Sequence, residues 1–215
     1  GDPRWGFPTE AEVDAFTMEA ARAWLSDALA REPVEITIVG DVEPETARAA
    51  VASTFAALAP RETALVLPEE TGSVRFPDPV QEPVQVRYNG RSDQARIAVY
   101  WPTADASDVR RARAASLLSS VLRLKATDVL REREGAPYSP GVSNVMSETY
   151  PGYGYMGVSV NIDTADAERV YALIDEIAAE LADGGLSEDE MTRARQPILE
   201  QIEKARERNG FWLQR

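Results

Sequence analysis

The stretch LREREGAPYSPGVSN, residues 130–144, carries the two side chains whose types and spacing most favour a chemical role. Arg131 and Tyr138 lie on either side of Gly135 and Pro137, which are residues typical of a helix end. A guanidinium and a phenol brought together at a helix-to-strand turn form a pair of hydrogen-bond donors. Such a pair can hold a peptide carbonyl or an oxyanion that develops from it. Arg131 and Tyr138 are therefore the candidate substrate-binding residues.

The same stretch also has an explanation that needs no ligand. Arg131 suits the negative end of a helix dipole, and Gly135 suits the left-handed residue that follows a helix. Pro137 prevents the helix from resuming, and Tyr138 favours the strand that follows. From composition and local pattern alone, this structural explanation is favoured over the functional one.

The residue types that the sequence lacks exclude several kinds of site. The 215-residue chain contains no Cys and no His, so it holds no disulfide, no thiol nucleophile, no Ser-His-Asp triad and no His-bearing zinc motif. Its net charge of −13 argues against a nucleic-acid interface and against an anionic membrane surface. No segment approaches the ~18 apolar residues of a membrane span. We nominate no metal ligand, and no acid–base pair stands out among the 36 acidic residues.

Two further motifs have ordinary structural explanations. Gly40-Asp41 follows the β-favouring run VEITIVG, but no Gly-rich phosphate loop accompanies it, so we interpret it as a turn. The acidic run SEDE fits a capping box between Ser187 and Glu190 better than a cation site. Carboxylates stabilise the positive N-terminal end of a helix without any ligand.

The elements that position Arg131 and Tyr138 follow from hydrophobic periodicity and from capping and turn residues. Helices are predicted at 10–30, 44–58, 106–133, 164–183 and from 187 towards 208. Strands are predicted at 34–40, 84–89, 94–102, 138–147 and 153–161. Paired strands followed by helices predict an α+β fold, with helices packed on one face of a mixed or antiparallel sheet.

The chain is expected to form a single domain over residues 1–215 that is a fragment of a longer protein. Within it we expect a leading helix at 1–33 and an α+β core at 34–215. Residues 59–83 are rich in Pro and Glu and are predicted to form an irregular connection over the surface.

Four stretches, in order, resemble the C-terminal-type, inactive domain of the insulinase/pitrilysin family of zinc metallopeptidases. They are VEITIVGDVEPETARAAVASTFAAL at 34–58, LREREGAPYSPGV at 130–142, YGYMGVSVNID at 153–163 and GGLSEDEMTRARQPIL at 184–199. The resemblance implies an α+β domain of the processing-peptidase type. It also implies that such domains pair and close around an unfolded peptide.

The resemblance assigns a specific role to the candidate pair. One domain of each family pair binds zinc through an inverted His-x-x-Glu-His motif, and the opposite domain supplies an Arg and a Tyr seven residues apart. Arg131 and Tyr138 match that spacing. Tyr138 would donate its phenol to the substrate carbonyl or oxyanion, and Arg131 would help to hold it. The chain itself is expected to bind no metal, with zinc in a partner domain on the same or another chain.

The resemblance leaves a second function open, because the family also includes structural or assembly subunits without peptidase activity. The absence of His and the acidic surface fit that role equally well. The opening GDPRW and the closing NGFWL resemble long bacterial envelope members of the family, in which this would be the last domain. We expect as partners a zinc-bearing homologous domain and an unfolded peptide, with no nucleic acid and no membrane insertion.

Overall fold

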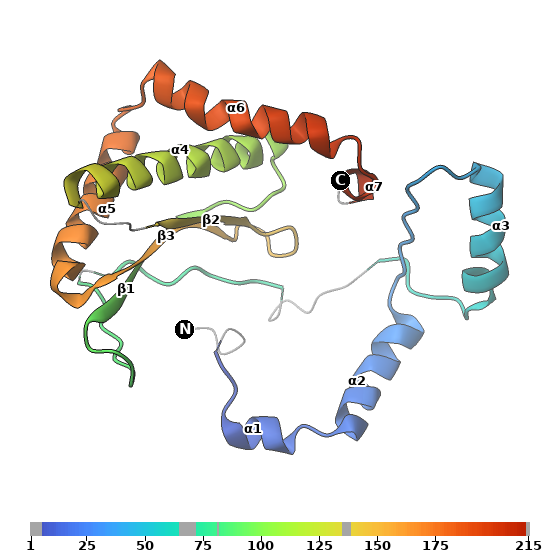
Figure 1. Cartoon of the computed structure of the whole chain (residues 1–215). Helices are drawn as coiled ribbons and strands as arrows, with labels where there is room; N and C mark the ends of the chain where they lie inside the picture. The colour runs from blue at the N-terminus through green and yellow to red at the C-terminus, as the bar shows by residue number, and fades with distance from the viewer. Residues whose placement is uncertain (1–5, 65–71, 81, 135–138, 214–215) are drawn as a thin grey trace. The chain divides into compact units, whose positions relative to one another are not determined.

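Contacts along the chain divide it into two compact units in the computed structural model. Unit 1 comprises residues 1–69 and 202–215, and unit 2 comprises residues 70–201. The structure describes residues 6–64, 72–80, 82–134 and 139–213. Unit 2 holds the sheet together with the helices that carry the candidate site (Figure 1).

The sheet of unit 2 is antiparallel, with its strands in the order β1-β3-β2. The strands are β1, Gln94–Thr103; β2, Gly141–Met146; and β3, Gly154–Asp163. The central strand β3 alternates as its sequence predicts, and its buried face carries Met156, Val158, Val160 and Ile162. Because one face of β3 is apolar, the register of both neighbouring strands is fixed.

Two helices cover the apolar face of this sheet (Figure 1). They are α4, Val109–Glu134, and α5, Ala167–Ala182, which follows the short 3₁₀ helix η3, Thr164–Asp166. From α4, Leu122, Ala126 and Leu130 enter the core at intervals of four residues, as an amphipathic helix requires. From α5, the core receives Val170, Leu173, Ile174 and Ile177. The predicted α+β fold, with helices on one face of an antiparallel sheet, is confirmed.

The helix α6, Glu188–Ala205, begins in unit 2 and lies on the side of α4 away from the sheet (Figure 1). The predicted capping box forms at its start. The Ser187 amide donates to Glu190 Oε2 at 2.8 Å, and the Glu190 amide donates to Ser187 Oγ at 3.2 Å. Gly184 ends the preceding helix in the left-handed region, with φ of +83°, so the predicted stop at this glycine pair is confirmed.

The secondary-structure elements in the described residues of unit 1 are helices. Its elements are α1, Glu10–Ala15; α2, Met18–Arg31; α3, Pro44–Thr54; the 3₁₀ helix η2, Phe55–Ala57; and α7, Asn209–Leu213. The Arg61 guanidinium donates to the backbone carbonyls of Leu29 and Glu32. It thereby satisfies carbonyls that the C-terminal end of α2 leaves without a helical partner.

Two predicted helices differ from the structure at their ends because side chains cap them. The single helix expected at 10–30 is divided, since the Thr17 side chain accepts the Ala20 amide at 3.1 Å and starts α2 afresh. The long helix begins at Val109 rather than at 106, because Asp108 accepts the amides of Arg110 and Arg111. The capping box predicted at Thr9 and Glu12 forms at the start of α1.

Two predicted strands are wrong in this structure. Residues 34–40 and 84–89 belong to no helix or strand, and most of their apolar side chains are exposed, with Val39 half-buried. β-Branched residues favour an extended backbone, but a strand also needs a neighbour for its amides and carbonyls. In the interval 59–83, which was expected to form an irregular connection, the described residues 59–64, 72–80 and 82–83 belong to no helix or strand.

No helix in the described residues is both long and apolar enough to cross a membrane.

Candidate functional site

Arg131 lies in the last turns of α4 with its side chain exposed. The residue before it, Leu130, is fully buried, so the phase of the helix fixes the direction of both side chains. Tyr138 lies outside the described residues, and the pairing of Arg131 with Tyr138 therefore stays a prediction. What the structure does show is a rigid helical support for Arg131.

A hydrogen bond ties α4 to the beginning of β2. The Arg123 guanidinium donates to the carbonyl oxygen of Val142 at 2.8 Å, and Val142 itself is buried in the core. This contact fixes the start of β2 against the body of α4, two turns before Arg131. The helix end and the strand start that border the candidate segment are thus held on one rigid layer, which is what a precise binding site requires.

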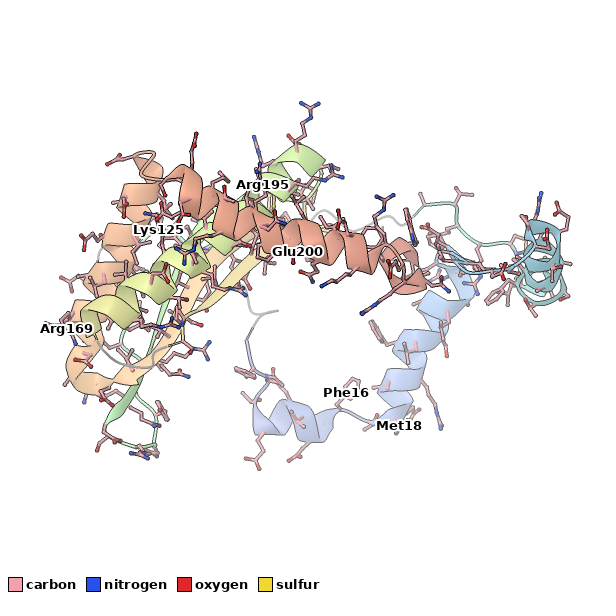
Figure 2. All side chains as sticks on the ribbon, turned by 45° about the horizontal axis from the view of Figure 1, so that its top comes forward. Phe16, Met18, Lys125, Arg169, Arg195 and Glu200 are labelled. Carbon is pink, nitrogen blue, oxygen red and sulfur yellow. The ribbon has the colours of Figure 1, made fainter. Side chains whose placement is uncertain are left out.

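A nearly buried lysine joins the three helices of unit 2 (Figure 2). Lys125 Nζ of α4 lies 2.7 Å from Glu180 Oε1 of α5 and 3.0 Å from Glu190 Oε1 of α6. Burial lowers the Lys125 pKa, but its hydrogen bonds to both carboxylates outweigh that effect and raise the pKa above its ordinary value. Lys125 was not among the residues predicted from the sequence, although its place between Leu122 and Val129 on the apolar stripe was a usable signal.

At the opposite end of α4, an open groove of about 650 Å³ lies between that helix and the sheet. Its helix wall carries Arg111, Ala114, Ala115 and Leu118, which follow one another at the spacing of a single helix face. Met146 of β2 and Met156 of β3 line the opposite side. This groove could not be predicted from the sequence, because its lining comes from several distant segments.

Asp105 fixes the chain beside this groove. Its carboxylate accepts hydrogen bonds from the Gly152 amide, the Ser107 hydroxyl and the Ser107 amide. These bonds, led by that from Gly152, lower the Asp105 pKa to about 2. The turn between β2 and β3 is thereby attached to the segment that leads into α4.

The donors in this chain do not fit a zinc ion. Zinc sites in proteins are built mainly from Cys and His, which the sequence lacks entirely. Within the described residues, no three Asp or Glu side chains lie close enough together to hold any metal ion. We therefore assign no step of any reaction to a metal held by this chain.

Comparison with known proteins identifies the relatives of this fold. Residues 15–198 match the family model described as the Peptidase M16 inactive domain. The chain belongs to the M16 peptidase family. This result confirms the predicted relation to insulinase/pitrilysin-type peptidases and to their C-terminal-type domain.

A solved structure of a conserved protein from Enterococcus faecalis has the same fold as this M16 domain. The two superpose with a TM-score of 0.69 at 20% sequence identity, over 97% of this chain and 47% of that one. The M16 domain therefore spans about half the length of this relative. Comparison with curated proteins finds no match.

Proposed function

We propose that this M16 domain forms the non-catalytic half of a peptide-binding cleft, opposite a zinc-bearing homologous domain of a metalloendopeptidase. Membership of the inactive-domain family supports this role. The length of the Enterococcus faecalis relative, of which this chain covers 47%, is consistent with a second domain of similar size. The zinc and the catalytic base would belong to that partner domain, and an unfolded peptide would be the substrate.

The observation that carries the proposal is the exposed position of Arg131 at the end of an anchored helix. A planar guanidinium can donate two hydrogen bonds to a peptide carbonyl, and it stays charged at all physiological pH values. The role of Tyr138 is to donate its phenol O–H to the oxyanion that develops on the same carbonyl. A donor on a rigid element stabilises that charge without reorganising during the reaction.

The experiment requires the intact protein that contains this domain together with its zinc-bearing partner. Tyr138→Phe removes one hydroxyl and should lower kcat/KM by ~10²–10³-fold, as removal of an oxyanion donor does elsewhere. Arg131→Ala should also lower kcat/KM, while bound zinc per molecule stays at the wild-type level. Arg195→Ala is the matched control, because Arg195 is an exposed arginine on α6 (Figure 2). Wild-type turnover in both test variants would refute the role.

A second candidate function is supported by the surface of unit 1. The side chains of Phe16, between α1 and α2, and of Met18 and Trp24, on α2, are each more than two-thirds exposed. Figure 2 labels Phe16 and Met18. Apolar side chains of this size favour a contact with another protein, which fits a structural or assembly module. An intact protein that binds no zinc and cleaves no peptide, but loses a partner on Phe16→Ser, would favour this alternative.

A further inference from the structure

The first turns of α4 carry a charge pattern that helix stability does not explain. Arg110, Arg111 and Arg113 lie within five residues of the helix start at Val109. Cations are unfavourable at this end, because the unsatisfied backbone amides give it a partial positive charge. The cluster also occurs in a chain whose net charge is −13. Three arginines in this position therefore point to a negatively charged partner.

The groove between α4 and the sheet begins at Arg111. Along its helix wall, Arg111 is followed by Ala114, Ala115 and Leu118 on the same face. The two alanines leave a depression, and Leu118 remains 43% exposed at its side. Met146 and Met156 complete the apolar lining. The groove thus combines a cation at one end with an apolar surface along its length.

We infer that this groove binds an acidic segment of an extended peptide. An apolar side chain of the peptide packs between Leu118 and Met146, and a neighbouring carboxylate of the peptide bonds to the Arg111 guanidinium. Methionine side chains adapt to different shapes, so the groove accepts several apolar residues. Because the groove is open, it suits a peptide better than a small molecule, whose sites enclose most of the ligand.

The local charge balance favours an anionic peptide. Asp105 and Asp108 are the carboxylates of the segment 105–113, against the three arginines. Both carboxylates accept hydrogen bonds from backbone amides, and Asp105 also interacts electrostatically with Arg111, so the segment keeps a net charge of +1. Repulsion between an acidic peptide and the acidic side chains elsewhere on the protein weakens with distance and with salt, whereas the arginines attract the peptide at short range. The apolar lining must then supply the remainder of the affinity.

This binding site is separate from the candidate pair of the proposed function. Arg111 and Arg131 are twenty residues apart on one helix, which corresponds to roughly 30 Å along its axis. An extended peptide needs about nine residues to cover such a distance. The groove is therefore a second peptide-binding site, and binding to it needs neither zinc nor a partner domain. Its binding can be measured on this chain alone.

The test measures fluorescence anisotropy of a labelled peptide in the presence of the 215-residue chain. The peptide contains adjacent Leu and Glu and has about ten residues, a length that fills the groove and extends beyond it. A second peptide carries Gln in place of Glu. Wild-type protein should bind the Glu peptide about tenfold more tightly, as one charged hydrogen bond implies. Arg111→Gln should remove that preference, and Leu118→Ser should weaken the binding of both peptides severalfold.

Two variants serve as controls for this experiment. Arg195→Gln makes the same change of charge on α6 and should leave both affinities unchanged. Arg131→Ala should also leave them unchanged, so failure of the proposed function and failure of this inference are distinguishable. Far-UV circular dichroism checks that each variant is folded.

Several outcomes would overturn the inference. One is the absence of saturable binding up to about 1 mM, the weakest affinity that such a contact should give. Another is a preference for the Glu peptide that survives Arg111→Gln. Displacement of the labelled peptide by decanoate at a lower concentration than by unlabelled peptide would show that the groove takes a fatty acid instead.

Discussion

Replacing Lys125 by Met should destabilise unit 2 by removing the charge that joins α4, α5 and α6. Met keeps the apolar stem of the side chain, so the packing changes little and the charge is lost. The Lys125 side chain is 8% exposed, while its partners Glu190 and Glu180 are 24% and 51% exposed. The ion pairs are therefore neither fully buried nor on the open surface.

The expected cost lies between two limits. Breaking a fully buried pair costs ~3–5 kcal/mol, because one charge is left without compensation. An exposed pair contributes ~0–1 kcal/mol. In Lys125→Met the most buried member is removed, and the carboxylates that remain can recover part of their hydration. We expect a loss of about 2 kcal/mol in the free energy of unfolding of unit 2.

The dependence on pH follows from the shifted pKa values of this cluster. Hydrogen bonds from Ser187, followed by those from Lys125, lower the Glu190 pKa from 4.5 to about 2. This carboxylate therefore contributes stability that is complete above pH 4.5 and is lost as the pH falls through about 2. The Lys125 pKa is raised above 10.5, so its contribution is lost only as the pH rises beyond that value. The difference in the free energy of unfolding between wild type and Lys125→Met should be largest between pH 4.5 and pH 10.5, and it should become smaller in acid.

Hydrogen exchange of the amides in α4 and α5 is the appropriate assay, because it reports unit 2 separately from unit 1. Glu190→Gln completes a double-mutant cycle, since Gln can still make the capping box with Ser187. A coupling energy of about 1 kcal/mol between the two substitutions is expected at pH 7. Lys204→Met, an exposed lysine on α6, is the control. A coupling energy near zero, or an equal loss in the control, would refute the reasoning.

Two further substitutions test the packing of unit 2. Leu130→Ala should cost ~2–5 kcal/mol because Leu130 is fully buried, whereas Leu118→Ala, at 43% exposure, should cost less than about 1 kcal/mol; urea denaturation compares the two. Gly157→Val should cost ~1–3 kcal/mol, since a Cβ at Gly157 would lie 2.5 Å from the ring of Tyr100. Tyr100→Ala in the same chain should restore most of that loss, and a double variant as unstable as Gly157→Val alone would contradict the steric explanation.

The parts of the fold that the sequence predicted are those determined by local pattern. The alternation of β3 and the stripe of α4 depend on residues two to four positions apart. The capping boxes at Thr9 and Ser187 depend on a partner three residues away. Each of these signals is contained within one element, so no knowledge of the tertiary structure was needed.

The parts that the sequence did not predict depend on residues from distant segments. Residues 34–40 and 84–89 have the composition of strands, but pairing requires a neighbouring strand that local pattern cannot supply. Lys125 stands on the apolar stripe of α4 in the sequence, but the sequence does not show which carboxylates neutralise its charge. It is buried because Glu180 and Glu190, which are 55 and 65 residues further along the chain, converge on it.

The candidate site combines both kinds of information. The spacing of Arg131 and Tyr138 is a property of the sequence, but the exposure of Arg131 follows from the buried stripe of α4, which ends at Leu130. A donor contributes to binding only if its helix holds it within a fraction of an ångström of the required position. Leu130 should therefore affect peptide turnover in the intact protein without touching the peptide. Since α4 also carries Arg111 on its first turn, the same core that anchors one end of the helix positions the groove at the other.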